Sequence, residues 1–239
     1  MSNLKSAFSQ GLFQQSSTKM ERLGALRIEA DGRKFRYGKA GAAVGAGKNT
    51  SQCACAANHI NLAIPAAYPI GAMQLSVTVG ATAVTADAYA DGFLQVNDAT
   101  GEGYSYRIES NTACDSGGTT IVQLADPLQV ALVASTSEVS LVPNPWSSVI
   151  TNANPTDAPA GCAVRAMTSG YYGWFQTGGV GIYLADGTPA VGQMLVLSST
   201  DGALEIGNST YTSTEPIVAT ALGTAGVDTE YKPCLYKID

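Results

Sequence analysis

The only histidine in the sequence, His59, limits the chemistry that the chain can carry out. A catalytic triad would have to be built around this residue, and its neighbours Ala57, Asn58 and Ile60 supply neither a nucleophile nor a second metal ligand. The sequence also lacks the HExxH and GxSxG motifs of zinc peptidases and serine hydrolases. We therefore interpret His59 as a packed or surface residue. We predict that the protein is not an enzyme and that it uses no cofactor and no metal.

The five cysteines do not form a pattern typical of disulfide frameworks or zinc sites, because their number is odd and no CxxC pair occurs. Cys53 and Cys55 are two residues apart, which would place both on one face of a strand. We interpret the cysteines as small buried apolar residues and expect the chain to fold in a reducing cytoplasm. The cysteines are Cys53, Cys55, Cys114, Cys162 and Cys234.

Four acidic residues, Asp87, Asp91, Asp98 and Glu102, form a loose cluster that suggests calcium as one alternative. Their spacing does not match an EF-hand loop, and Asp91-Gly92 is typical of a turn. Paired carboxylates for glycoside hydrolysis are a second alternative, since such pairs meet only in space. We favour turn roles for these residues.

The densest aromatic run is residues 171–175, Tyr-Tyr-Gly-Trp-Phe. Alternation along a strand would bury Tyr172 and Trp174 together on one face. Core packing is the favoured interpretation, and an interface patch or a carbohydrate-binding platform are the alternatives.

Positive charge is concentrated at the start of the chain. Residues 1–40 hold eight basic and three acidic side chains, a net charge of +5, whereas the remaining chain carries −11. This asymmetry favours a basic arm that contacts an acidic partner surface, with a solvated terminus as the alternative. Nucleic acid is not expected as the partner, because no run of five Lys or Arg and no recognisable binding fold are present. The contact candidates are Arg22, Arg27, Arg33, Lys34, Arg36 and Lys39.

The chain contains no signal peptide pattern and no apolar run that approaches 18 residues. We therefore expect neither secretion through a signal peptide nor a membrane partner.

Strand signals recur from residue 31 onward. Asp-Gly pairs at 31–32, 91–92, 186–187 and 201–202 are typical of turns. Between the turns, apolar residues alternate with polar ones, as expected for half-buried antiparallel strands. The alternating sets are Leu75, Val77 and Val79; Tyr104, Tyr106 and Ile108; Leu128, Val130 and Leu132; and Cys234, Tyr236 and Ile238. The sequence predicts a mainly β fold, with an extended N-terminal arm followed by two small antiparallel β modules that are barrel-like or sandwich-like.

The density of prolines predicts where the modules meet. Pro143, Pro145, Pro155 and Pro159 cannot all lie inside central strands, so we place a linker at residues 143–161. The predicted order is an arm with the first strand at 1–45, one β module at 46–142, the linker, and a second β module at 162–239. We expect deletion of residues 1–30 to leave both modules folded but to weaken attachment to the partner surface. The small size of the modules favours their mutual packing or oligomerisation.

Several segments resemble a family of tailed-phage head proteins. Residues 31–42 are similar to the family's DGRxFRYxxAGA opening, and residues 90–108 are similar to its middle motif. The similarity extends from about residue 30 to the C-terminus. The other segments that carry the resemblance are residues 139–145, 170–177, 216–222 and 230–231.

The resemblance implies a capsid decoration (cement) protein, a structural component that binds the outer surface of the assembled shell and clamps neighbouring subunits. It further implies the major capsid protein as partner, self-association as a homotrimer, and a location on the virion after synthesis in the host cytoplasm. A head fibre or tail-associated structural protein is the alternative within the same class. A carbohydrate-binding module for host adsorption is the alternative from another class.

Overall fold

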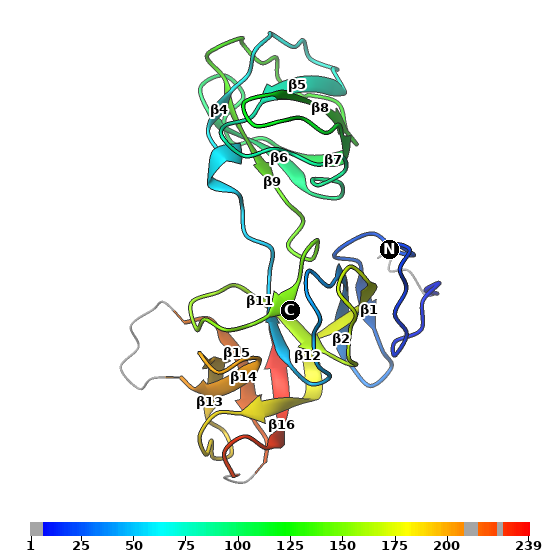
Figure 1. Ribbon diagram of the computed structural model, residues 1–239, viewed down its shortest axis with the longest axis vertical. Coiled ribbons are helices and arrows are strands. Elements are labelled where there is room, and N and C mark those ends of the chain that lie inside the picture. Colours follow the sequence, from blue (N-terminus) through cyan, green and yellow to red (C-terminus); the bar gives the residue numbers. More distant parts are fainter. Residues whose placement is uncertain (1–6, 208–214, 224–226) are drawn as a thin grey trace. The chain divides into compact units, whose positions relative to one another are not determined.

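Nearly all regular structure in the computed structural model, which describes residues 7–207, 215–223 and 227–239, is β (Figure 1). One short 3₁₀ helix, η1 (Ala57–His59), accompanies the strands in these residues. Nowhere in the described ranges does a helix have the length and apolar character needed to cross a membrane. The prediction of a mainly β fold made of small antiparallel modules is confirmed.

The chain is divided into two compact units whose arrangement along the sequence differs from the expected one. Unit 1 combines the described residues up to Cys53 with those from Pro145 to Asp239, and unit 2 comprises Ala54–Asn144. Unit 2 approximates the expected module at 46–142. Unit 1 combines the expected arm, residues 46–53, the expected linker from Pro145 onward and the expected C-terminal module, so unit 2 is an insertion within unit 1.

The proline-rich segment belongs to unit 1 from Pro145 onward, whereas Pro143 belongs to unit 2. Pro159 is the first residue of a strand, where its missing N–H costs no ladder bond. The carbonyl of Pro145 accepts a hydrogen bond from the Cys53 N–H at 2.9 Å, so the segments that leave and re-enter unit 1 are adjacent. Between these prolines, Ile150 and Thr151 pair with Ser51 and Thr50.

Unit 1 is built around one long strand, β12, which pairs with β2, β11, β14 and β16. The order β12-β14-β13-β15-β16 returns to β12 and closes a small barrel. All pairings in unit 1's ladders are antiparallel except β12–β14. The strands are β1 (Leu26–Ile28), β2 (Lys34–Lys39), β3 (Asn49–Ser51), β10 (Ile150–Thr151), β11 (Pro159–Ala163), β12 (Tyr172–Ala185), β13 (Met194–Leu197), β14 (Ala203–Ile206), β15 (Ile217–Ala221) and β16 (Tyr231–Lys237).

The first half of β12 is buried on both faces. Trp174 packs with Phe35 and Tyr37 of β2 on one face, and Phe175 joins a second apolar cluster on the other. Tyr172 packs on the same cluster as Trp174, as the alternation predicts, and is half-buried. The aromatic run is therefore mainly core.

The described part of the expected arm is folded onto unit 1. Phe8 contacts the edge of Trp174, with ring centroids 4.9 Å apart, and the backbone carbonyl of Gln10 accepts the Trp174 indole N–H at 3.2 Å. Gln10 also accepts a hydrogen bond from the Tyr37 hydroxyl at 2.7 Å through Oε1. Because these contacts cover a buried aromatic cluster, residues 7–30 are an integral layer of unit 1. Residues 1–6 of the predicted arm lie outside the described residues.

Unit 2 is a six-stranded antiparallel sheet in the order β4-β9-β6-β7-β8-β5. Its core contains Leu75, Val77, Tyr106 and Ile108, as their alternation predicts. Residues 128–132 form no regular strand, although Leu128 and Leu132 are buried and Leu132 makes a single bridge to Tyr68. The strands are β4 (Leu62–Ala63), β5 (Gln74–Thr78), β6 (Phe93–Asp98), β7 (Ser105–Asn111), β8 (Thr119–Leu124) and β9 (Glu138–Val142).

Candidate functional site

The β1–β2 hairpin of unit 1 and the turns beside it bring the six basic contact candidates together. Arg27 lies on β1, Lys34, Arg36 and Lys39 lie on β2, and Arg33 immediately precedes β2. Arg22 is exposed in the segment before β1. Five of the six candidates therefore lie on or beside the β1–β2 hairpin, and Arg22 lies in the segment that leads to it.

Most of these basic side chains also bind groups within unit 1. Arg27 pairs with Glu29 at 2.6 Å and lies over the rings of Phe8 and Trp174. Arg36 pairs with Asp239, and Lys34 donates to the backbone carbonyl of Asp239 at 3.2 Å. These contacts stabilise unit 1, so the presence of Arg27, Lys34 and Arg36 is explained without contact with another protein.

The other three basic side chains make fewer contacts within unit 1. Arg33 pairs through Nε with Asp31 at 2.7 Å, and Lys39 lies over the ring of Tyr172. Arg22 makes no ion pair with any residue of the described ranges. Contact with a partner stays a prediction for the whole set, and Arg22, Arg33 and Lys39 are its strongest members.

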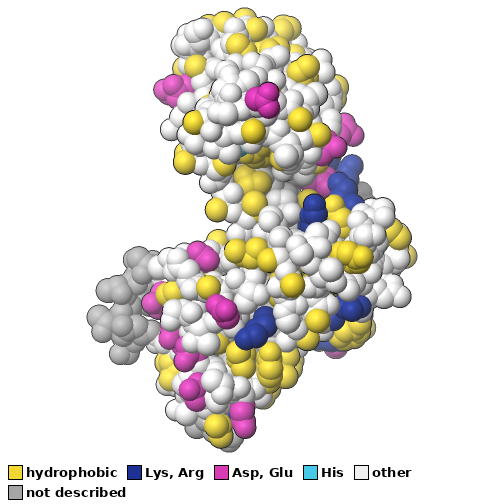
Figure 2. Space-filling view, in the orientation of Figure 1, with side chains coloured by type: hydrophobic (Ala, Val, Ile, Leu, Met, Phe, Trp, Pro, Cys, Tyr) yellow, Lys and Arg dark blue, Asp and Glu magenta, His cyan; other side chains and the backbone are white. Residues whose placement is uncertain are grey.

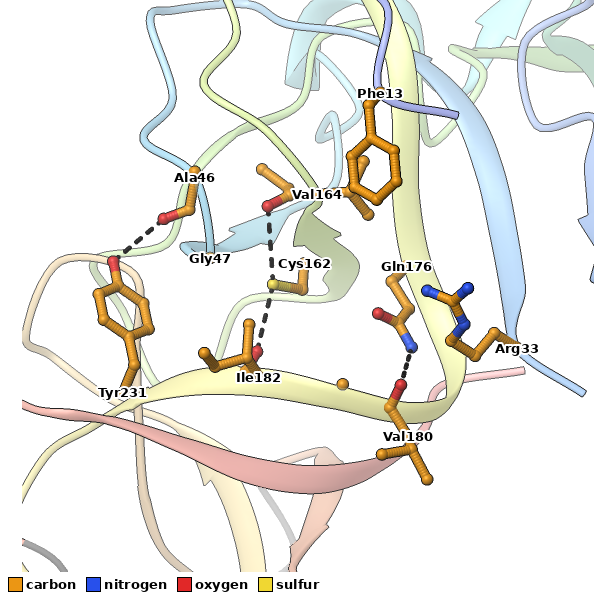
Figure 3. Close-up of a pocket in the computed structure, with 12 residues that line it drawn as sticks. Phe13, Arg33, Ala46, Gly47, Cys162, Val164, Gln176, Val180, Ile182 and Tyr231 are labelled. Atoms are coloured by element: carbon orange, nitrogen blue, oxygen red, sulfur yellow. Dashed lines mark hydrogen bonds between the residues drawn. The ribbon is translucent and has the colours of Figure 1, made fainter. Parts of the chain in front are cut away.

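A pocket of about 520 Å³ opens on unit 1 between β11, β12 and the loop before β3 (Figure 3). Its rim carries four large hydrophobic side chains that are exposed to solvent, namely Phe13, Val180, Ile182 and Tyr231. Its floor includes Cys162, Val164 and Gln176, and Arg33 lies at one side. The pocket is therefore mainly apolar, with one cationic group at its side.

Unit 1 also carries an uneven distribution of charge over its surface. On the face drawn in Figure 2, acidic side chains gather over β13 to β15, whereas Lys and Arg lie toward β12 and β2. Hydrophobic side chains lie between these two groups. Such a surface combines apolar contact area with charges of both signs, as protein-binding surfaces do.

The polar groups around the pocket are largely satisfied from within unit 1. The Tyr231 hydroxyl donates to the carbonyl of Ala46 at 3.0 Å. The Gln176 amide nitrogen donates to the carbonyls of Val180 at 2.8 Å and Gly178 at 3.1 Å. These bonds fix the side chains that shape the pocket before any ligand binds, which lowers the entropic cost of binding.

The thiol in the pocket floor is not an activated nucleophile. Burial raises the pKa of Cys162 to about 11, although a hydrogen bond with Tyr236 opposes the shift. Burial likewise raises the pKa of Cys234 to about 12, and the Cys162 charge adds to this shift. Both groups are therefore protonated thiols at neutral pH, whereas a nucleophilic cysteine needs a lowered pKa.

Cys53 and Cys55 do not share the buried environment that their spacing suggests. Cys53 is half-buried and Cys55 is exposed, because β3 ends at Ser51 and both residues lie beyond it. Cys114 is half-buried against the core of unit 2.

His59 is a packed residue of unit 2. Its Nε2 lies 2.9 Å from the carbonyl of Thr82, so this nitrogen carries the proton and donates. Its Nδ1 therefore accepts from the hydroxyl of Tyr89. Both ring nitrogens are thus used to hold η1 against a neighbouring loop.

Of the four acidic residues singled out in the sequence, Asp87, Asp91 and Glu102 occupy turns and Asp98 is the last residue of β6. Asp87 and Asp91 have φ values of 57° and 62°, and Asp98 caps the N–H of the following Ala99. Within the described ranges, no three His, Cys, Asp or Glu side chains lie close enough together to hold a metal ion. Because Trp174 and Phe175 are buried, they provide no exposed platform for a sugar ring.

The acidity of the chain is concentrated in unit 2. The sequence between Ala54 and Asn144 contains eight acidic residues and a single basic residue, Arg107, which gives a net charge of −7. The sequence of unit 1 contains twelve basic and eleven acidic residues, a net charge of +1. Like charge disfavours association between copies of unit 2.

The pocket was not predicted from the sequence, because six separate segments line it. Phe13, Arg33 and Tyr231 are far apart in the chain, and no motif connects them. The nearest available signal was the run of exposed apolar residues at Val180 and Ile182, which alternates with glycines. Comparison of the chain with models of protein families, with curated proteins and with solved structures finds no match.

Proposed function

We propose that the protein is a structural component of a tailed-phage virion that binds the outer surface of the capsid and stabilises the shell as a cement protein. The resemblance of residues 31–42, 90–108 and 170–177 to phage head proteins supports this proposal. Unit 1 is the attachment unit in this proposal.

The observation that carries the proposal is the set of exposed hydrophobic side chains around the unit 1 pocket. Phe13, Val180, Ile182 and Tyr231 are each more than two-fifths exposed and line the same depression. Exposed apolar groups beside charged ones are typical of surfaces that another protein covers. The major capsid protein is the partner that the resemblance implies.

Stabilisation of the shell follows from mass action. A protein that binds the assembled shell and not free subunits stabilises the assembled state by RT ln(1 + [L]/Kd) at each site. Association of the protein as a homotrimer would multiply weak contacts through their effective concentration, by roughly 10²–10⁴. Light scattering of the isolated protein tests this part, because a 24.5 kDa monomer at micromolar concentration contradicts the trimer.

The attachment experiment mixes purified protein with expanded heads of the encoding phage that lack it. We expect the protein to sediment with the heads, to occupy regular positions on the lattice in images, and to raise the temperature at which the heads release DNA. Binding at the tail or at a single vertex would instead support a tail-associated protein or head fibre.

A matched pair of variants locates the attachment surface. Ile182→Asp places a negative charge beside the pocket. Ile121→Asp is the control, because it places the same charge on a strand of unit 2. The native side chains are similarly exposed, at 49% for Ile182 and 40% for Ile121. We expect Ile182→Asp to reduce attachment at least tenfold and Ile121→Asp to change it less than twofold. Equal attachment of both variants would contradict the assignment of unit 1.

A further inference from the structure

One edge of β12 is left without a neighbouring strand in the middle of unit 1. On one side, β12 pairs with β16 continuously from Gly178 to Leu184. On the other side, the pairing with β11 ends at Gln176 and the pairing with β14 begins at Leu184. The edge between these two points faces the pocket, whose lining includes Val180, Gly181 and Ile182.

The backbone groups of Val180 and Ile182 point toward this open edge. Ile182 lies opposite Pro233, which has no N–H, so this pair exchanges no ladder hydrogen bonds and the N–H and carbonyl of Ile182 turn away from β16. Alternation gives Val180 the same direction, and gives the opposite direction to Ala185, whose N–H donates to Glu230 on the β16 side.

The carbonyls at the open edge are already occupied by side chains. The Tyr236 hydroxyl donates to the Ile182 carbonyl at 2.8 Å, and Gln176 donates to the Val180 carbonyl. The Tyr236 ring crosses β12 directly over Gly181, where any Cβ would lie 2.8 Å from the ring. The N–H groups of Val180 and Ile182, by contrast, have no acceptor in the part of the chain that the structure describes.

Arg33 adds further unused donors beside this edge. Its Nε binds Asp31 and its guanidinium lies over the Phe35 ring, 5.5 Å from the centroid, while its terminal nitrogens donate no hydrogen bond within residues 7–207, 215–223 and 227–239. Figure 3 shows the guanidinium beside Gln176, on the pocket side of β12. The open edge and the guanidinium therefore present hydrogen-bond donors, and the apolar rim surrounds them.

We propose that the open edge of β12 binds an extended, carboxylate-bearing peptide segment as an added strand. Carbonyls of the segment accept from the N–H groups of Val180 and Ile182, an acidic side chain pairs with Arg33, and apolar side chains enter the pocket. A pocket of about 520 Å³ is within the size range of ligand sites, roughly 300–1,000 Å³. That the segment comes from a shell subunit rests on the proposed function, whereas the site itself does not.

The test uses the full chain and the peptide Ac-Thr-Val-Asp-Val-Thr-NH₂, followed by amide NMR. We expect saturable shifts of the Val180 and Ile182 amides, and slower hydrogen exchange of these two amides in the bound state. The same peptide with Lys in place of Asp should bind at least tenfold more weakly. Absence of saturable shifts up to about 5 mM, or equal binding of both peptides, would overturn the proposal.

Two matched pairs of variants test the Arg33 guanidinium and the Ile182 backbone N–H separately as hydrogen-bond donors to the peptide. Arg33→Gln should weaken peptide binding at least tenfold, and Arg107→Gln in unit 2 should not, although their native side chains are equally exposed at 33% and 32%. Ile182→Pro removes one open N–H without removing a ladder bond, and Ile182→Val keeps it. If Ile182→Pro fails to fold, the hydrogen-exchange rates of the Val180 and Ile182 amides in the wild-type protein, with and without the peptide, decide whether these N–H groups bind it. Saturable binding of decanoate at the same amides, with no binding of the peptide, would show a small amphiphile site instead.

The outcomes distinguish this inference from the proposed function. Binding of the peptide without attachment to heads would contradict the cement proposal alone. Attachment to heads without protection of the Val180 and Ile182 amides would contradict the strand-addition site alone.

Discussion

Arg36 binds both carboxylate oxygens of Asp239, with Nε 2.7 Å from Oδ2 and Nη2 3.0 Å from Oδ1. The pair joins residues that are 203 positions apart, and connects the basic hairpin to the end of β16. Burial alone would raise the pKa of Asp239. The hydrogen bonds from Arg36 and Thr177 and the positive charges of Arg36 and Lys34 outweigh burial, and the net shift is downward.

The Arg36–Asp239 pair should make the stability of unit 1 depend on pH. Because the folded-state pKa of Asp239 is lowered, its contribution is complete above the unfolded-state pKa of about 4 and is lost as pH falls through the folded-state value. We expect Asp239→Asn to lower the free energy of unfolding by roughly 1 kcal/mol at pH 7 and by less at pH 3. Urea titrations followed by tryptophan fluorescence measure this in unit 1, which contains both tryptophans. An equal loss at both pH values would contradict the assignment.

Phe8 should contribute to the stability of unit 1. The contacts of Phe8 and Gln10 with Trp174 argue against the expectation that both modules stay folded when residues 1–30 are deleted. Truncation of this half-buried ring in Phe8→Ala should cost about 2 kcal/mol. Phe13→Ala is the control, since Phe13 is 62% exposed, and should cost less than about 0.5 kcal/mol. Similar losses for both variants would contradict the described packing.

Unit 2 should be separable from unit 1. Joining Cys53 to Pro145 through a short Gly-Ser linker is expected to leave unit 1 folded, because the N–H of Cys53 already bonds the carbonyl of Pro145. The excised fragment 54–144 should fold as well, since its buried core is formed entirely by its own residues. Circular dichroism and cooperative thermal unfolding of each fragment measure this. Loss of tryptophan burial in the joined unit 1 would show that the units depend on each other.

Cys162 and Cys234 should resist alkylation in the native protein. Their pKa values, raised to about 11 and about 12 mainly by burial, leave almost no thiolate at pH 8. Iodoacetamide followed by mass spectrometry should modify the exposed Cys55 first, and should modify Cys162 and Cys234 only after unfolding in urea. Rapid native modification of Cys162 would mean that the pocket floor opens readily.

Replacement of His59 should affect the stability of unit 2 only. His59→Ala removes hydrogen bonds to Tyr89 and Thr82 and leaves the Thr82 carbonyl without this donor, so we expect a loss of roughly 1–2 kcal/mol. Tyrosine fluorescence or hydrogen exchange in unit 2 measures the loss, and tryptophan fluorescence of unit 1 is the internal control. A simultaneous change in both units would contradict the local role.

The class of fold could be predicted from the sequence because it depends on local signals. Alternation at Leu75 and Val77 and the Asp-Gly turns report strand and turn geometry directly, and the structure contains them. The division into units could not be predicted, because Cys53 and Pro145 are neighbours only after folding. Residues 128–132 show the same limit, since their buried leucines alternate without joining a regular strand.

The candidate site depended even more on non-local contacts. The cluster of basic residues around β2 was visible as sequence charge, but its ion pair with Asp239 was not. The open edge of β12 arises because β11 and β14 pair with different parts of one strand, and Pro233 sets the direction of its backbone groups. The pattern of residue types along a strand does not show which of its backbone groups pair with a neighbouring strand and which stay unpaired.

The insertion of unit 2 between Cys53 and Pro145 also has a consequence for heredity. Two crossovers, one at each end of the codons for residues 54–144, would replace one whole unit and leave the coding sequence of unit 1 intact on either side. Selection on the two units is therefore separable, and lineages can diversify or lose the acidic unit while retaining the other.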